Sequence, residues 1–518
     1  MKPTFCTTGR CRGLSSPWRC LLMAATVFAA LALGSGAFAQ PEQGEAAPQT
    51  EGSADETEES LEEQTEGSVD ESADTTATAE EVAGDTEPFE EVTEEDWGEF
   101  DEWEEQAEDS PGGTAFRFEL GGFVEVLTAP RVVRSSASAN EFVANEARFR
   151  LNLDATHEVA SARFRGDIFA DAAAMRIWFD IRDASIFVRP SSWFNMRFGR
   201  QVLTWGTGDF LFLNDLFPKD FESFFIGRAD EYLKAPSNSI ITTFTIKKVG
   251  LDLVWTPIFE PDRFIDGERL SFFNPLAGEI IGDRSPLTPI EPLFPEQRLR
   301  NGTVHGRLYG TAGAYELAAY GYVGYWPQPT AFDLTDPTDP STVQGLTYAR
   351  LAVYGASIRG PMFGGLFNVE AAYYDSFEDR DGTDAAIPNP QLRGLVGYER
   401  ELFPKFQMGL QYYLEYTVHY DELISNSFFP QYEPDEFRHL LTLRLTQLLV
   451  LDRLELSLFA FFSPNELDTY IRPRISYKII DPLAFVVGAN LMFGRDDFTF
   501  FGQLKENTNA YVRLRYSF

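Results

Sequence analysis

From residue 115 to the C-terminus, short segments alternate apolar and polar side chains, and this alternation constrains the fold more than any other feature of the sequence. The segments are about ten residues long, which is the length of a strand that crosses a bilayer obliquely. One of the clearest, 147–154, reads ARFRLNLD, and others are 407–418, 453–460 and 471–479. No run of about 18 apolar residues occurs here, so no membrane-spanning helix is expected.

The two faces of these segments distinguish a membrane barrel from a soluble one. One face carries Leu, Ile, Val, Tyr and Phe, and the other carries Arg, Glu and Gln over many segments. In a soluble barrel the enclosed face would be the apolar one. A charged enclosed face fits a water-filled lumen with the apolar face turned to lipid. The sequence therefore predicts an all-β fold, a transmembrane antiparallel up-and-down β-barrel.

The segments and their connections give the number of strands. We count about 18, at 116–127, 145–156, 160–171, 176–188, 193–200, 238–248, 250–258, 301–311, 314–325, 347–359, 363–375, 391–402, 406–418, 436–449, 452–463, 468–478, 482–493 and 508–518. The connections alternate between short and long, as periplasmic turns and external loops do in such barrels. Two connections on the long side, 172–175 and 464–467, are short, so 16 strands are an alternative. The alternation slips near Asp183, which indicates a bulge.

The first 110 residues have two different compositions. Residues 1–39 are predicted to be a signal peptide, because basic residues precede a stretch of 14 residues, Leu21–Gly34, and Ala37-Phe38-Ala39 fits a cleavage site. All three cysteines lie in this leader, so the mature chain is expected to lack disulfides and thiol chemistry. Residues 40–110 hold 29 acids and no Lys or Arg, which predicts a disordered periplasmic segment before the barrel at 111–518.

The end of the acidic segment carries aromatic residues in the range 88–107. They are Phe89, Trp97, Phe100 and Trp103, and the last three are spaced so that on a helix they would share a face. One interpretation is a docking motif that folds on a periplasmic or inner-membrane partner. The other, which we favour, is a solvated tail with a few apolar rings.

The C-terminus ends in a strand with alternate apolar residues, Val512, Leu514, Tyr516 and Phe518. A terminal Phe with aromatic and apolar residues at alternate positions before it resembles the C-terminal signal of bacterial outer-membrane proteins. The resemblance implies recognition of Tyr516 and Phe518 by the barrel assembly machinery. Together with the leader, it implies insertion in the lipid bilayer of a Gram-negative outer membrane.

The enclosed face of the predicted barrel is rich in arginine. The predicted pore-lining set is Arg148, Arg150, Arg163, Arg165, Arg197, Arg307, Arg444, Arg472, Arg474, Arg513 and Arg515. One interpretation is a passage that favours small anionic or polar solutes, since guanidinium groups offer forked donors to carboxylates and hydroxyls. The other is structural, because Arg and acidic residues also pair with one another and keep the lumen polar. The sequence alone favours neither.

A long segment after the fifth predicted strand is a candidate constriction loop. Its motif residues are Trp205, Gly206, Gly208, Asp209, Asp215, Pro218 and Asp220. Glycines at these positions permit sharp re-entry of the chain, and the acids would then face the arginines across the lumen. The alternative is an ordinary external loop, and we favour the inward fold.

This stretch resembles a motif of porin-like barrels in the broad alginate-export superfamily. The matching residues are Gly199-Arg200-Gln201, then Trp205-Gly206-x-Gly208-Asp209, and Asp215 with Pro218 and Asp220. The resemblance implies an outer-membrane channel or exporter, and it does not imply alginate as the substrate. The acidic segment departs from the pattern of that superfamily.

Several function classes are disfavoured by the sequence. None of the histidines His157, His305, His419 and His439 lies in an HExxH motif, and no GxSxG elbow or phosphate loop occurs, so we expect neither an enzyme nor a cofactor or metal site. The acidic excess argues against nucleic-acid binding. The expected function is a porin-like channel for small anionic or polar solutes. The alternative is an export barrel docked to a transport complex through 88–107. Nothing in the sequence gives the oligomeric state.

Overall fold

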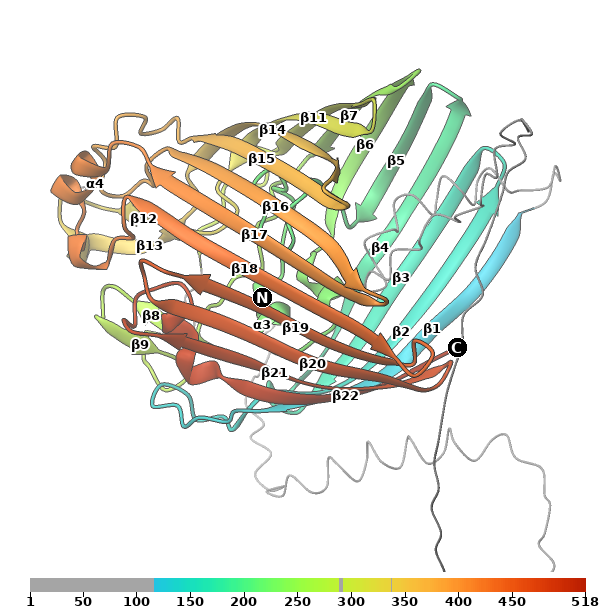
Figure 1. Cartoon of the computed structure of the whole chain (residues 1–518). Coiled ribbons are helices and arrows are strands. Elements are labelled where there is room, and N and C mark those ends of the chain that lie inside the picture. Colours follow the sequence, from blue (N-terminus) through green and yellow to red (C-terminus); the bar gives the residue numbers. More distant parts are fainter. Residues whose placement is uncertain (1–115, 288–291, 337) are drawn as a thin grey trace, which may run out of the picture. The chain divides into compact units, whose positions relative to one another are not determined.

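The computed structural model of the chain describes residues 116–287, 292–336 and 338–518. In these residues, 18 antiparallel strands form one closed barrel (Figure 1). The barrel strands are β1 (Arg117–Pro130), β2 (Phe142–His157), β3 (Ala160–Asp171), β4 (Arg176–Ser191), β5 (Phe194–Gln201), β6 (Ser237–Ile246), β7 (Val249–Thr256), β10 (Thr303–Ala312), β11 (Tyr315–Tyr325), β14 (Arg350–Met362), β15 (Gly365–Asp375), β16 (Gln391–Phe403), β17 (Phe406–Thr417), β18 (Phe437–Leu449), β19 (Leu454–Ser463), β20 (Asp468–Ile480), β21 (Leu483–Gly494) and β22 (Asn509–Ser517).

Each barrel strand pairs with the barrel strands before and after it, and β22 pairs with β1 to close the ring. The predicted count of 18 strands is therefore confirmed. The short connections at 172–175 and 464–467 join β3 to β4 and β19 to β20, which excludes the alternative of 16 strands.

The two faces of the barrel wall differ as the alternation predicts. On β2, Phe149 and Leu153 are 39% and 43% exposed, whereas Arg148 and Arg150 are 2% and 4% exposed. Exposed apolar side chains recur on the other strands and include Leu253, Val304, Leu317, Leu410, Ile475 and Val512. An apolar outer surface around a charged interior is the arrangement of a barrel that stands in lipid.

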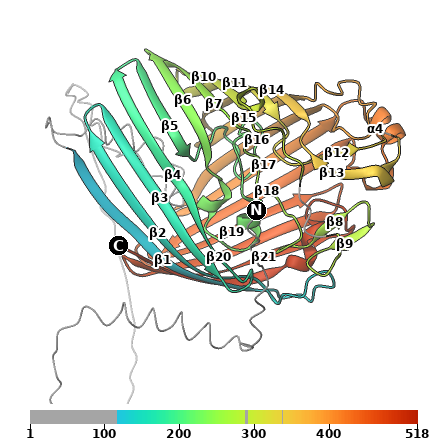
Figure 2. The same ribbon diagram turned by 180° about the vertical axis from the view of Figure 1, so that it is seen from behind.

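The two ends of the barrel also differ. Except for the turns at 172–175 and 464–467, the tight turns between barrel strands lie at the same end as the C-terminus. One of them uses positive φ at Phe363 (51°) and Gly364 (73°), as a two-residue hairpin turn requires. The long loops lie at the other end, where Figures 1 and 2 show α4 and the two small hairpins. Elements in these loops are β8 (Phe272–Asn274), β9 (Glu279–Ile281), η2 (Leu299–Asn301), β12 (Ala331–Leu334), η3 (Pro340–Thr342), β13 (Val343–Thr347), α4 (Tyr420–Asn426), η4 (Pro430–Tyr432) and η5 (Gly502–Asn507). Within the described ranges, no helix is long and apolar enough to cross a membrane.

The predicted bulge near Asp183 is confirmed on β4. Arg165 pairs with Asp183 and Gly166 pairs with Ile181, so Arg182 has no partner across the β3–β4 pair. Both Arg182 and Asp183 are buried. The extra residue thus turns two consecutive charged side chains toward the interior, which strict alternation would forbid.

Candidate functional site

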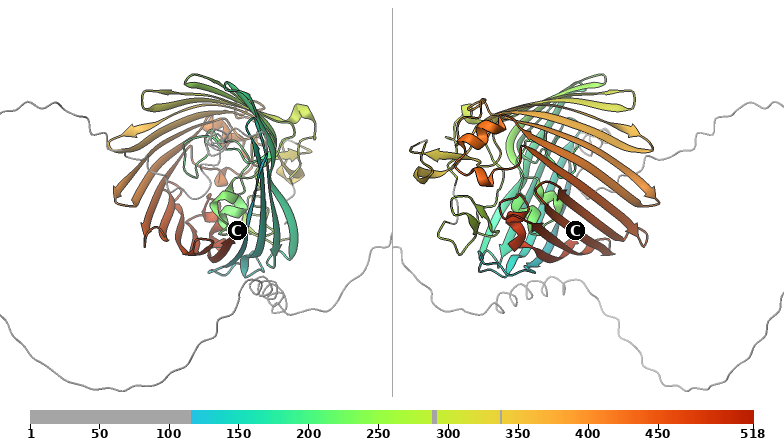
Figure 3. Two further views of the ribbon diagram at one scale, coloured as in Figure 1. Left: turned by 90° about the vertical axis from the view of Figure 1, so that its right-hand side faces the viewer. Right: turned by 60° about the vertical axis from the view of Figure 1, so that its left-hand side comes forward.

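One long loop lies inside the barrel and crosses it. This crossing loop, residues 202–236, connects β5 to β6 and contains α3 (Phe221–Phe225) and η1 (Asp230–Leu233). Figure 3 shows α3 within the ring of strands. Its contacts with the wall are Thr207 with Glu370 of β15, Asp209 with Arg444 of β18, Asp230 with Arg472 of β20, and Glu231 with Arg150 of β2 and Arg515 of β22. These strands lie on different sides of the barrel, so the loop spans the lumen.

Aromatic packing holds the middle of the crossing loop against the wall. The ring of Phe210 lies 4.9 Å from that of Phe459 on β19, and Phe224 lies 5.6 Å from Tyr470 on β20, both edge-to-face. Asp220 caps α3, accepting a hydrogen bond from the Ser223 amide at 2.8 Å. Burial of such rings stabilises the packing of the loop, and edge-to-face pairs add about 1 kcal/mol each.

The glycines of the predicted constriction motif are needed where the loop folds back. Gly206 has φ of +90°, a conformation that side chains disfavour. A Cβ atom on Gly208 would lie 2.2 Å from the carbonyl oxygen of Leu211. Trp205 beside them is buried, with its ring 5.0 Å from that of Phe217.

The other acids of the motif are engaged within the loops. Asp215 accepts hydrogen bonds from the Thr204 hydroxyl at 2.7 Å and from Lys219 Nζ at 2.9 Å. Asp220 pairs with Arg263, in the loop after β7, at 3.2 Å. Asp215 thus holds the crossing loop to itself, and Asp220 holds it to the loop after β7. Among the acids of the crossing loop for which ion pairs are described, Asp209, Asp230 and Glu231 reach arginines of the wall.

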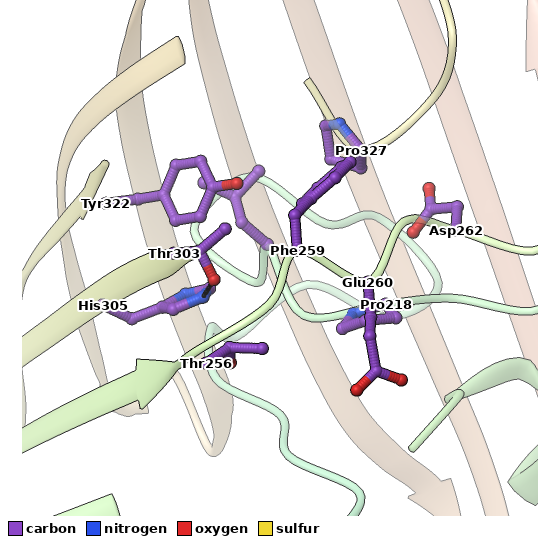
Figure 4. Close-up of a pocket in the computed structure, with 10 residues that line it drawn as sticks. Pro218, Thr256, Phe259, Glu260, Asp262, Thr303, His305, Tyr322 and Pro327 are labelled. Atoms are coloured by element: carbon purple, nitrogen blue, oxygen red, sulfur yellow. Dashed lines mark hydrogen bonds between the residues drawn. The ribbon is translucent and has the colours of Figure 1, made fainter. Parts of the chain in front are cut away.

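A small cavity marks the junction of the crossing loop with the loop after β7 (Figure 4). It is lined by Leu216, Pro218, Thr256, Phe259, Glu260, Asp262, Thr303, His305, Tyr322 and Pro327. The Lys219 amide donates to Asp262 at 2.8 Å. Burial raises the pKa of Asp262 to about 6, against the pull of Lys219. His305 stacks on Phe217 with ring centres 4.4 Å apart, so it serves as a packing partner of the loop.

The arginines near the closure of the barrel are met by the last turn of the crossing loop. Arg150 bonds Asp167 of β3 at 2.7 Å and Glu231 at 2.8 Å, and Arg515 bonds Glu231 at 3.0 Å. Burial opposes the charge of Glu231, but Arg150, Arg515 and Arg182 outweigh it and hold the pKa of Glu231 well below its usual range. The loop thus supplies a carboxylate that stays charged between two wall arginines.

Most of the predicted pore-lining arginines have a carboxylate within ion-pair distance. The pairs are Arg148 with Glu125 and Glu146, Arg150 with Asp167, Arg163 with Asp154, Arg197 with Asp183, Arg307 with Asp252, Arg444 with Asp209, Arg472 with Asp230, Arg474 with Asp230 and Glu455, and Arg513 and Arg515 with Glu125. Arg165 lies on the same face of β3 as Arg163. The interior is therefore charged on every side, with its positive charge largely compensated.

Some residues that hold the crossing loop were not among those predicted. Glu370 of β15 bonds the loop near Thr207, and Tyr232 donates its hydroxyl to Asp167 at 2.7 Å. Arg182 donates to the carbonyl oxygens of Glu231 and Lys234 at 2.7 and 2.9 Å. The alternation along β15 predicts that the side chain of Glu370 points into the barrel. The same alternation does not predict the direction of Arg182, because a bulge interrupts it there.

The C-terminal residues complete the ring. The amide of Phe518 donates to the Gly122 carbonyl at 2.9 Å, and the Gly122 amide donates to the Phe518 carbonyl at 3.0 Å. Tyr516 pairs with Val124 on β1. The C-terminal residues that resemble an assembly signal thus lie where β22 pairs with β1 and closes the barrel. The aromatic residues Phe89, Trp97, Phe100 and Trp103, the predicted signal peptide and the acidic segment lie outside the described residues.

Within the described part of the chain, no group of three or more His, Cys, Asp or Glu side chains is arranged to hold a metal ion.

No protein-family model matches the chain, and no curated protein matches its sequence. Among solved structures, it is similar to OccD3 (OpdP) of Pseudomonas aeruginosa, with 11% identity, a TM-score of 0.44 and coverage of 77% of this chain and 91% of that one. It is also similar to OccAB1 of Acinetobacter baumannii, with 9% identity, a TM-score of 0.45 and coverage of 79% and 98%. It is also similar to the outer membrane channel DcaP of A. baumannii, with 8% identity, a TM-score of 0.38 and coverage of 79% of this chain and 99% of that one. With each of these TM-scores below 0.5, the likenesses carry no conclusion about function.

Proposed function

We propose that the protein is a porin-like channel of a Gram-negative outer membrane that passes small polar or anionic solutes. The observation that carries this proposal is the barrel itself: an apolar outer face surrounds a charged interior that a folded loop crosses. A charged interior would be costly in a protein whose barrel enclosed its own core. A loop inside the barrel supports a role in limiting what passes.

The chemistry of the interior supports polar solutes as the substrate class. Guanidinium groups alternate with carboxylates along the wall, as at Arg474 with Glu455 and Arg307 with Asp252. Such pairs offer donors and acceptors to hydroxyls and carboxylates alike. Anion preference would then depend on how far the loop carboxylates neutralise the arginines.

The test is single-channel recording of residues 40–518 in planar bilayers. We expect discrete conductance steps with a measurable reversal potential in a salt gradient. Vesicle swelling with neutral and anionic solutes of the same size then ranks the two classes. Folded barrels that never conduct, at any voltage and without any added partner, would contradict the channel function.

The export alternative and the resemblance to the alginate-export superfamily make a separate prediction. Removal of residues 40–110 should abolish binding of a transport partner and leave the barrel folded. Conductance that is unchanged by this deletion, with no partner captured by residues 40–110, would leave the channel alone as the function.

A further inference from the structure

The tip of the crossing loop rests on one buried carboxylate. Glu370 of β15 is 1% exposed. Its Oε2 accepts hydrogen bonds from the Thr207 amide at 2.8 Å and the Thr207 hydroxyl at 3.0 Å. Its Oε1 accepts from the Asn214 amide at 3.0 Å and from Asn214 Nδ2 at 2.8 Å. Four donors thus converge on the two oxygens, and all four belong to the loop.

The same strand holds the tip at two further points. Asn368 Nδ2 donates to the carbonyl and hydroxyl oxygens of Thr207, at 2.9 Å each. The Tyr374 hydroxyl donates to the carbonyl oxygen of Leu213 at 2.6 Å. Asn368, Glu370 and Tyr374 alternate along β15, so one face of a single strand provides a continuous seat for the loop.

A glycine on the neighbouring strand, β14, leaves space for the tip of the loop. A Cβ atom on Gly355 of β14 would lie 1.8 Å from Asn214 Oδ1. A Cβ atom on Gly206 of the loop would lie 3.1 Å from Glu370 Oε1. Because both positions are glycine, no side chain keeps the loop away from the carboxylate of Glu370.

We propose that Glu370 positions the tip of the crossing loop, residues 206–214, and thereby fixes the width of the passage beside it. This proposal rests on the proposed channel function. A buried carboxylate is costly unless donors compensate it, and here the loop supplies them. A neutral glutamine has the same shape but turns one acceptor into a donor, which opposes either Thr207 or Asn214.

The experiment uses a thiol reporter in the chain, because the predicted mature sequence has no cysteine. Leu213 at the tip is 1% exposed, so Leu213→Cys should be protected from a charged thiol reagent while the tip is seated. In Glu370→Gln we expect labelling to be about tenfold faster or more, because the loss of hydrogen bonds to a buried charge shifts the opening equilibrium by at least that factor. Conductance and reversal potential should change together with labelling.

The matched control is Glu401→Gln, the same substitution on the next strand, β16. Glu401 is exposed and accepts a hydrogen bond from the Lys405 amide at the turn end at 2.7 Å. Heat-dependent gel migration identifies folded barrels. If Glu370→Gln does not fold, Asn214→Ala and Thr207→Val remove donors from the loop side and leave the wall intact.

The outcomes separate the two proposals. If Glu370→Gln folds and its labelling and conductance match those of Glu401→Gln, the positioning role is overturned. If Glu370→Gln does not fold, the same result in the loop-side variants overturns it. If Glu370→Gln is labelled faster but the barrel never conducts, the positioning role of Glu370 is supported and the channel function is rejected.

Discussion

At the scale of the residue, Asp209 places a carboxylate where its charge is costly. Its side chain is 22% exposed and pairs with Arg444 of β18 at 2.5 Å. Burial raises the pKa of Asp209 to about 6; Arg444 and Arg472 oppose this rise, whereas Glu399 and Asp230 add to it. The backbone amide of Asp209 donates to the side-chain oxygen of Gln411 on β17 at 3.2 Å.

The sign of the resulting pH dependence follows from linkage. An acid with a pKa of about 6 in the seated loop and an ordinary value of 3.8 in water binds a proton more tightly when the loop is seated. The loop contact therefore gains stability, on the order of 1 kcal/mol between pH 7.5 and pH 5.5, and gains more as the pH falls further toward 4. We expect labelling of Leu213→Cys to be slower at pH 5.5 than at pH 7.5, after division by the rate in Asp209→Asn, in which position 209 cannot titrate. A ratio that stays constant with pH would rule out this role of Asp209.

Gly355 gives a second prediction at this scale. In Gly355→Ala the new methyl group would lie 1.8 Å from Asn214 Oδ1 of the loop and 2.7 Å from the Ala371 carbonyl oxygen of β15. Overpacking of this kind costs about 1–3 kcal/mol, and the Asn214 side chain, which makes the closer contact, should yield before the backbone of the strand does. We expect faster labelling of Leu213→Cys in a folded barrel. Gly394→Ala on β16 is the control, because nothing lies within 4 Å of its Cβ position. Equal labelling in the two alanine variants would show that the tip tolerates the methyl group.

At the scale of the element, the seam between β22 and β1 ends at the terminal residue, Phe518. Phe518 exchanges two backbone hydrogen bonds with Gly122, and its ring stacks on Phe149 of β2 at 6.2 Å. Phe518→Ala removes the ring contact, and we propose that it also weakens recognition by the assembly machinery. The fraction of heat-modifiable barrel in outer membranes should fall by more than half, because a loss of about 1–2 kcal/mol acts on a marginal step.

The control for the seam is Phe363→Ala. Phe363 lies in a tight turn and is 84% exposed. If Phe518→Ala and Phe363→Ala accumulate in the membrane equally, the terminal ring has no special role in assembly.

The strands were predictable from the sequence because each one has to satisfy two environments. Because lipid lies outside and water or charged groups lie inside, apolar and polar side chains alternate along each strand. This alternation is present even where the residues have a weak preference for β-strands. The arrangement of the crossing loop was less predictable from the sequence. Trp205, Gly206 and Gly208 indicated a re-entrant turn, but the direction of Asp215 and Asp220 depends on Lys219 and Arg263, which lie in loops without periodicity. The role of Glu370 depends on contacts between residues far apart in the chain.

At the scale of the whole molecule, the barrel balances its interior charge with its own loop. Arginines that are spread over the strands near the closure meet Asp230 and Glu231 on one short turn of the crossing loop. The arginines predicted to line the pore are thus compensated in part by carboxylates of the strands, such as Asp167 and Glu125, and in part by these two acids of the crossing loop. The loop therefore contributes to the electrostatic potential of the barrel interior.

This balance predicts the effect of removing the two loop carboxylates. In the double variant Asp230→Asn, Glu231→Gln, the arginines at 150, 472, 474 and 515 lose partners at 2.8, 2.5, 3.6 and 3.0 Å. The lumen becomes more positive, so the reversal potential in a potassium chloride gradient should move toward the chloride equilibrium potential. The shift should be larger at about 0.1 M salt than at about 1 M, because screening shortens from about 10 Å to about 3 Å.

A control with the same change of charge outside the lumen is Glu401→Gln, Asp452→Asn. Both carboxylates lie at the turn end, where each contacts Lys405. If this control moves the reversal potential as far as the loop variant does, the field at the mouth sets the selectivity and the compensation inside the barrel does not. If only the loop variant moves it, the acids of the crossing loop determine how strongly the arginines of the wall attract an anion.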